Sequence, residues 1–263
     1  MTRIHSCLGL ATLTLLAITA SSQAAVLLSE SFNYTAGTSS GSNGGTGFGG
    51  AYTGTGSITA PGQTFTGITS AGNKFTTAGT DGGAFRTLSA PIGTDAGVIF
   101  VRFLTSSTAA ATPNYAGLSF FFGGSEELFM GKTGGAANYG IDVSGVGIAS
   151  STFPVSTATT LLVYRVSFGI ASDKIDLYVN PGSTLPVTPN ATFTTANNSA
   201  FPATFDNIRL QSGGGPETFN FDEIRIATTA AEVLPIPEPG SLGLMVGSIA
   251  LLGSQRRRKA KRA

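Results

Sequence analysis

The chain has 263 residues and a formal net charge of +1, with 41% hydrophobic and 11% charged residues. That hydrophobic fraction supports a packed core and excludes a wholly disordered chain. Residues 25–255 contain eight basic and 14 acidic side chains, a net charge of about −6, which argues against nucleic-acid binding because phosphates require a basic surface.

The first 24 residues have the features of a secretory signal peptide. Arg3 supplies the positive charge, and residues 8–20 form an apolar core of the expected length. Small side chains precede a predicted cleavage site between Ala24 and Ala25. The alternative reading, an N-terminal anchor, requires a longer apolar run than this one.

The only cysteine and the only histidine, Cys7 and His5, both lie in this signal segment. After cleavage the chain would have no disulfide, no thiol nucleophile and no histidine-based zinc site. A Ser-His-Asp triad would be excluded for the same reason.

Residues 25–233 are predicted to form one antiparallel β-sandwich domain, because short β-rich runs alternate with Gly, Ser and Asn turns. An opening strand begins at residue 26. The following Gly/Ser/Thr-rich stretch, residues 35–62, contains the single aromatics Phe48 and Tyr52. Those aromatics predict a loop packed over a sheet rather than a free linker.

Stronger strand signals follow along the chain. Residues 96–107 form a nearly continuous apolar run, typical of a strand that is buried on both faces or bends across a sandwich. Residues 115–132 are predicted to form a hairpin about Gly123 and Gly124. Residues 158–182 predict a second hairpin, because apolar side chains alternate on both sides of the polar turn at residues 171–174.

The sequence FDNIRL at residues 205–210 recurs as FDEIRI at residues 221–226. In both copies the apolar phase slips after the aspartate, which predicts a β-bulge or a strand bend there. The glycines at 213–215 and Pro216 fit a turn between the copies. We therefore expect the two strands to pair as neighbours.

The sequences KIDLYVNPG (residues 174–182) and NFDEIRIATTAAEV (residues 220–233) resemble the closing strands of concanavalin A-like, laminin-G-like jelly rolls, which are common on exported bacterial proteins. In a jelly roll the last strand lies beside the first. The resemblance therefore implies that residues 221–226 pair with residues 26–32.

Residues 234–263 have three parts in order. The triplet Pro237, Glu238 and Pro239 comes first, and the uncharged run from Pro239 to Gln255 has 17 residues. As a helix this run would span about 25 Å, a marginal length for a bilayer of roughly 30 Å. We expect a short transmembrane helix with its basic end in the cytoplasm. Its apolar residues are Leu242, Leu244, Met245, Val246, Ile249, Leu251 and Leu252, and its basic stop cluster is Arg256, Arg257, Arg258, Lys259, Lys261 and Arg262.

This order of triplet, apolar helix and basic cluster resembles the PEP-CTERM sorting signal. The resemblance implies an exported protein of a Gram-negative bacterium that uses the secretion machinery and resides transiently in the inner membrane. An exosortase would then recognise it, and the protein would reach the envelope, cell surface or extracellular matrix, associated with exopolysaccharide. The alternative is a plain tail anchor with a coincidental triplet.

No catalytic motif stands out, so the body is predicted to be non-enzymatic. The Glu-x-Asp-x-x-Glu pattern of jelly-roll glycosidases is absent, and Glu126 and Glu127 are adjacent, which would place them on opposite faces of a strand. Tyr52, Tyr115 and Tyr139 are candidates for stacking on sugars, although packing is the favoured interpretation of each.

No cofactor is predicted, apart from a structural calcium as an open alternative. Calcium prefers carboxylate and carbonyl oxygens. The candidate ligands are Asp173, Asp176, Asn180, Asp206 and Asp222, although no loop has EF-hand spacing. Asp206 and Asp222 are interpreted as groups that cap turns or bulges rather than as catalytic acids.

Three functions stay open at this point. The first is a non-catalytic surface or matrix protein, and the second is a carbohydrate-binding module of the polysaccharide layer. The third, a divergent polysaccharide-degrading enzyme, requires a pair of carboxylates in one cleft.

Overall fold

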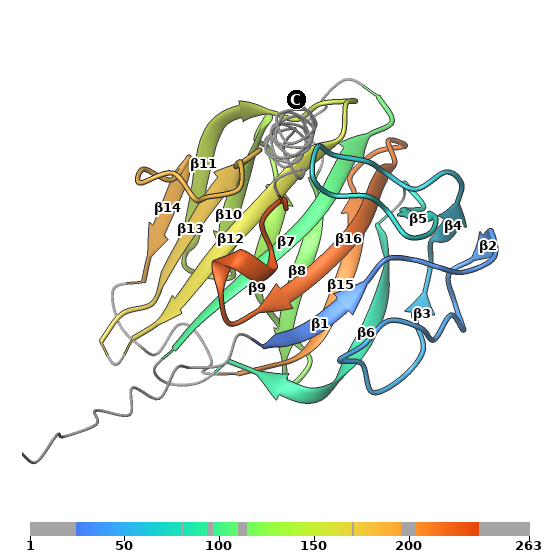
Figure 1. Ribbon diagram of the computed structural model, residues 1–263, viewed down its shortest axis with the longest axis horizontal. Helices are drawn as coiled ribbons and strands as arrows, with labels where there is room; N and C mark the ends of the chain where they lie inside the picture. The colour runs from blue at the N-terminus through green and yellow to red at the C-terminus, as the bar shows by residue number, and fades with distance from the viewer. Residues whose placement is uncertain are drawn as a thin grey trace, which may run out of the picture.

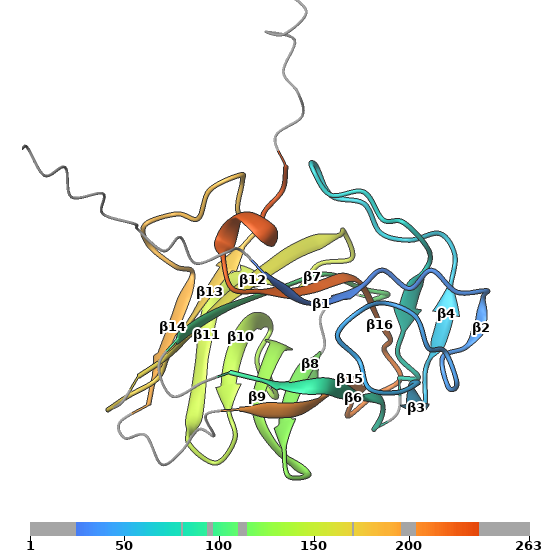
Figure 2. The same cartoon turned by 60° about the horizontal axis from the view of Figure 1, so that its bottom comes forward.

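The computed structural model describes residues 25–79, 81–93, 97–109, 115–169, 171–195 and 204–236. These residues form two antiparallel β-sheets packed face to face, seen as an upper and a lower layer in Figure 2. The predicted all-β sandwich is confirmed. The long strands alternate apolar and polar residues or are apolar throughout, so each sheet buries one face against the other.

Sheet I, shown across Figure 1, has the strand order β14-β13-β12-β7-β16-β5-β4-β2, and β1 also pairs with β16. The strands of sheet I are β14 (Ala191–Thr194), β13 (Lys174–Val179), β12 (Thr160–Phe168), β7 (Gly97–Ser107), β16 (Phe219–Ala227), β5 (Lys74–Thr76), β4 (Ser57–Thr59), β2 (Gly37–Thr38) and β1 (Val26–Glu30).

Sheet II has the order β11-β10-β9-β8-β15-β6-β3. The strands of sheet II are β11 (Gly147–Pro154), β10 (Asn138–Val143), β9 (Ser125–Lys132), β8 (Tyr115–Phe122), β15 (Phe205–Gly213), β6 (Gly82–Ile92) and β3 (Thr53–Gly54). A 3-10 turn, η2 (Ala230–Glu232), follows β16.

The core lies between the sheets and is rich in aromatic side chains. Phe103 and Tyr164 from sheet I stack with their ring centroids 6.0 Å apart. A smaller cluster lies on the other face of sheet I, where Leu104 and Val163 pack against Val233 and Leu234 beyond η2. Strands β7 and β12 are therefore covered on both faces, as the continuous apolar run of β7 predicted.

Both predicted hairpins are present. Strands β8 and β9 pair across the turn at Gly123 and Gly124, whose φ angles are +57° and +89°. Such left-handed backbone favours glycine, which explains the pair. Strands β12 and β13 pair from Leu162 with Val179 to Ser167 with Lys174.

The two copies of the repeated FD-x-IR sequence are both bulged, as predicted. The register shifts between Phe205 and Asn207 in β15 and between Asp222 and Arg225 in β16. The prediction that the copies pair is wrong. Strand β15 lies between β8 and β6 in sheet II, whereas β16 lies in sheet I. The turn after Gly213 carries the chain across the sandwich, so the two patterns match because both strands face the same core from opposite sides.

The predicted closure of the jelly roll is confirmed. Strand β1 pairs with β16, with Val26 opposite Ala227 and Glu30 opposite Ile224. The backbone N–H of Thr228 also donates to the Ala25 carbonyl at 3.0 Å. The first and last strands of the body therefore lie side by side, as Figure 1 also shows.

The Gly-rich segment 35–62 packs over the sandwich, as predicted, and adds the short strands β2, β3 and β4 at its edge. A buried ion pair of Arg86 and Glu30, 2.6 Å between Nη1 and Oε2, holds the segment. The guanidinium lies 3.8 Å from the Phe48 ring centroid and donates to the Gly44 carbonyl at 2.7 Å. One arginine thus ties β6 to β1 and to this segment.

The packed body reaches Ile236, whose N–H donates to the Gly67 carbonyl at 3.1 Å. Within the described ranges, no helix is long and apolar enough to cross a bilayer. The signal segment up to Ala24 and residues 237–263, with the Pro237-Glu238-Pro239 triplet, the apolar run and the basic cluster, lie outside the described residues.

Candidate functional site

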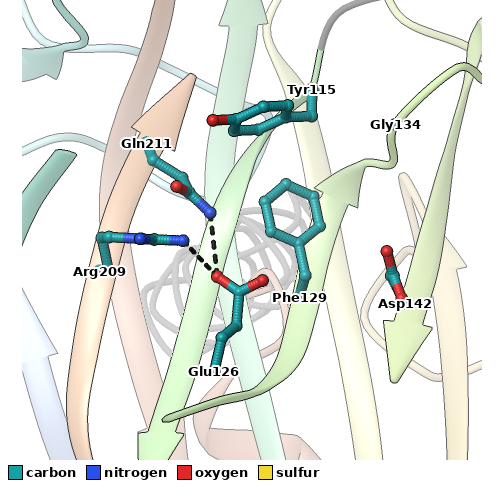
Figure 3. Close-up of a pocket in the computed structure, with 7 residues that line it drawn as sticks. All are labelled: Tyr115, Glu126, Phe129, Gly134, Asp142, Arg209 and Gln211. Carbon is teal, nitrogen blue, oxygen red and sulfur yellow. Dashed lines mark hydrogen bonds and ion pairs between the residues drawn. The ribbon is translucent and has the colours of Figure 1, made fainter. Parts of the chain in front are cut away.

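The candidate site is a pocket of about 250 Å³ on the face of sheet II that points away from the core (Figure 3). Strand alternation creates it. Leu118, Met130, Ile141 and Leu210 point into the core, so their neighbours in sequence point outward. The lining residues come from β8, β9, β10, β15 and the β9–β10 turn, and they are Tyr115, Glu126, Phe129, Gly134, Asp142, Arg209 and Gln211.

An ion pair between Arg209 and Glu126 forms one side of the pocket (Figure 3). Gln211 Nε2 donates to Glu126 Oε2 at 3.0 Å and to Ser119 Oγ at 3.1 Å. The Arg209 guanidinium also lies 4.8 Å from the ring centroid of Phe121 and 5.2 Å from that of Phe85. The pair is therefore held in place by rings as well as by hydrogen bonds.

Two aromatic rings line the pocket beside the ion pair. Tyr115 and Phe129 meet edge to face, with centroids 6.1 Å apart at 81°. The Phe129 ring occupies space that glycine provides, because a Cβ on Gly117 would lie 2.7 Å from that ring and 2.3 Å from the Met130 carbonyl oxygen. The site thus depends on a small residue at its floor.

Asp142 on β10 supplies a second carboxyl group to the pocket (Figure 3). Burial raises its pKa above the ordinary value, and the nearby negative charge of Glu126 raises it further. The pocket therefore offers carboxylate acceptors at Glu126 and Asp142 and amide and guanidinium groups at Gln211 and Arg209. This combination suits a ligand rich in hydroxyl groups.

Of the glutamates and tyrosines singled out from the sequence, the structure places some in the pocket and others outside it. Glu126 lines the pocket, and its neighbour Glu127 is not among the lining residues. Tyr115 lines the pocket as well. Tyr52 and Tyr139 are each only 1% exposed and belong to the core.

The calcium candidates lie on different elements and each has protein partners. Asp173 accepts from Gly169 N at 2.9 Å, and Asp176 pairs with Arg165 at 2.8 Å and Lys174 at 3.0 Å. Among the described residues, no three His, Cys, Asp or Glu side chains form a group that could hold a metal ion.

The remaining candidates have structural partners too. Asp206 accepts from the N–H of Gly123 at 3.0 Å in the β8–β9 turn. Asp222 accepts from Gln63 N at 2.7 Å and from Glu223 N at 2.8 Å at the bulge of β16. Asn180 Oδ1 accepts from Leu161 N at 2.8 Å.

Sequence reasoning missed Arg209, Gln211, Phe129 and Asp142. The signal for the first two was present, because Arg209 and Gln211 alternate with the apolar Ile208 and Leu210 in β15. That alternation predicts an outward polar row but says nothing about which strand lies beside it. The site exists only because β8 lies beside β15 and β9 lies beside β8.

No family model and no curated protein matches this sequence. Several solved structures are similar in fold. The globular domain of Trypanosoma cruzi calreticulin has a TM-score of 0.52 at 14% identity, over 89% of this chain and all of that one. Domain 4 of AbnA, an extracellular arabinanase of Geobacillus stearothermophilus solved with arabinotriose, has a TM-score of 0.50 at 15% identity, over 80% of this chain and 97% of that one. Together with the strand order and the closure of β1 on β16, these likenesses show a jelly-roll β-sandwich fold.

Proposed function

We propose that this protein is an exported, non-catalytic carbohydrate-binding protein whose site is the pocket on the outer face of sheet II. The observation that carries the proposal is the Arg209–Glu126–Gln211 group, held rigidly beside Tyr115 and Phe129. A sugar hydroxyl can donate one hydrogen bond and accept another at the same time. It can therefore bind a carboxylate acceptor and an amide or guanidinium donor that lie side by side. The sugar's C–H surface packs against aromatic rings.

The similarity in fold adds support. AbnA domain 4, which covers most of this chain, was solved with arabinotriose bound. A rigid sheet face positions side chains more accurately than a mobile loop does. The proposed site lies on four adjacent strands of such a face.

The experiment is a glycan array followed by calorimetry with the folded body. We expect retention of at least one oligosaccharide, and Gln211→Ala should weaken its binding about tenfold because the amide no longer orients Glu126. Glu127→Gln, a neighbour outside the pocket lining, serves as the matched control and should bind normally. A correctly folded body that retains no glycan, including the host's own polysaccharide, would contradict the proposal.

A second candidate, a polysaccharide-degrading enzyme, is favoured by one observation. Glu126 and Asp142 share a pocket, and burial and the Glu126 charge raise the pKa of Asp142, as a general acid requires. Release of reducing ends from the bound glycan, abolished in Asp142→Asn, would establish this activity. Binding without any release supports the non-catalytic proposal.

Delivery to the cell surface is the other part of the proposal, and it rests on the sequence alone. The signal peptide directs secretion, and the C-terminal apolar run holds the chain briefly in the inner membrane. An exosortase then acts near Pro237-Glu238-Pro239, and the body joins the envelope or exopolysaccharide. Mass spectrometry of the exported protein should find no Arg256–Arg262 cluster; an exported chain that keeps the cluster would argue against processing.

A further inference from the structure

We infer that the pocket selects neutral glycans and excludes anionic ones such as uronate-containing chains. The inference rests on the proposed carbohydrate-binding function and concerns the class of sugar. It follows from one arrangement. The guanidinium of Arg209, the group that would recognise an anionic sugar, already pairs with Glu126.

The charges around the pocket are predominantly negative. Among the described lining residues, Arg209 is the single basic side chain, and Glu126 and Asp142 are acidic. Asp81 lies beside the lining residue Tyr115, whose Oη donates to Asp81 Oδ1 at 3.3 Å. With all three carboxyl groups ionised, the formal charge of this set is −2.

Arg209 is not free to turn toward a ligand. Its guanidinium lies over both Phe85 and Phe121, and these rings themselves meet edge to face at 5.4 Å. The carboxylate of Glu126 is fixed from a second direction by Gln211. To bind a sugar carboxylate, the pocket would have to break the contacts that join Arg209, Glu126 and Gln211. Otherwise it would place like charges side by side in a partly desolvated space.

Neutral hydroxyls meet no such obstacle. A hydroxyl can donate to Glu126 or Asp142 without disturbing the ion pair. Hydrogen bonds to ionised groups are stronger than those between neutral groups, so the same arrangement that repels a uronate favours a neutral sugar. The Glu126 carboxylate thus acts as a filter on ligand charge.

Glu126→Gln is the variant that tests this role. It removes the negative charge and keeps the side-chain size. The Arg209 guanidinium stays over the two rings but has lost its carboxylate partner, so a sugar carboxylate that reaches it can pair with it. Binding would be measured by calorimetry on the full body with two probes of equal length, a neutral arabino-oligosaccharide and an oligogalacturonate. Glu127→Gln is the matched control, and circular dichroism and thermal unfolding verify that every variant folds.

We expect the parent protein to bind the neutral probe at least about tenfold more tightly than the uronate probe. In Glu126→Gln the uronate affinity should rise about tenfold and should weaken again at high salt, because an ion pair has been created. Glu127→Gln should keep the parent preference.

The outcomes separate the two proposals. Equal binding of both probes by the parent protein, or uronate binding unchanged in Glu126→Gln, overturns the charge filter and leaves carbohydrate binding in place. Binding of the neutral probe that survives both Gln211→Ala and Glu126→Gln removes the pocket from the function. If the folded body binds no glycan at all, the proposed function itself is overturned.

Discussion

At the scale of single residues, the body buries several carboxyl groups, among them Glu30 and Asp222. Asp222 is fully buried at the β16 bulge and accepts backbone hydrogen bonds from Gln63 and Glu223. Burial is the largest influence and raises its pKa to about 7, and the backbone bonds lower it in part. The bulge thus holds a carboxyl group that changes its charge near neutral pH.

This raised pKa predicts a pH-dependent stability. The protonated carboxyl group of Asp222 stabilises the folded state. This contribution is complete below the unfolded-state pKa of about 4 and is lost as the pH rises through about 7, the pKa in the folded state. Asp222→Asn should therefore lower stability by about 1 kcal/mol at about pH 4, where one backbone bond is lost, and should flatten the decline toward about pH 8. Urea unfolding of both proteins across this pH range measures this; parallel profiles would refute it.

The buried pair of Arg86 and Glu30 gives a second prediction at this scale. Both side chains are 1% exposed, and burial raises the pKa of Glu30. Arg86→Met leaves the carboxyl group of Glu30 without its cationic partner and should cost about 3–5 kcal/mol of unfolding free energy. Adding Glu30→Gln should recover part of that loss. Denaturant unfolding of the four proteins in the cycle tests the coupling, which would be disproved by strictly additive effects.

At the scale of elements, the outer face of sheet II depends on glycine. Gly117 in β8 lets the Phe129 ring of the neighbouring strand β9 lie against the sheet and line the pocket. A strand interior normally disfavours glycine, so its presence indicates a close approach. The pairing of two strands, rather than either strand alone, explains this residue.

Gly117→Ala should displace the Phe129 ring, because the new Cβ would lie within 3 Å of that ring and of a backbone carbonyl. We expect a loss of about 1–3 kcal/mol in stability and weaker glycan binding. Gly182→Ala is the control, since nothing lies within 4 Å of its Cβ position, and it should leave both properties unchanged. Thermal unfolding and calorimetry would measure both, and normal stability and binding in the Gly117→Ala variant would contradict the packing argument.

At the scale of the whole molecule, the sandwich is closed by a contact between its two ends. Strand β1 covers residues 224–227 of β16 and brings Leu28 into the core and Glu30 to Arg86. This pairing joins segments about 200 residues apart, and such non-local contacts slow folding.

A chain that begins at Ser31 should not fold cooperatively, whereas one that begins at Ala25 should. Removing β1 leaves an open edge along residues 224–227 of β16 and deprives Arg86 of its carboxylate partner. Denaturant unfolding and amide hydrogen exchange at residues 224–227 would show the difference. Equal stability and equal protection in the shorter chain would refute this view of closure.

Local sequence determined much of the fold. Alternation in residues 158–182, the glycines at 123 and 124, and the slipped phase after Asp206 and Asp222 predicted two hairpins and two bulges correctly. These features depend on neighbours in sequence, because side-chain direction and turn conformation are set within a few residues. The jelly-roll resemblance added the pairing of the first and last strands.

Tertiary structure alone decided which sheet each strand joins and therefore where the pocket lies. The two FD-x-IR strands look like partners in sequence, yet they lie in opposite sheets, because the chain crosses the sandwich after Gly213. The pocket gathers Tyr115, Glu126, Asp142 and Arg209 from four strands spread over almost a hundred residues. An alternating pattern fixes which face a side chain takes but not its neighbours across the sheet, and pairing over such distances is settled by how the whole core packs.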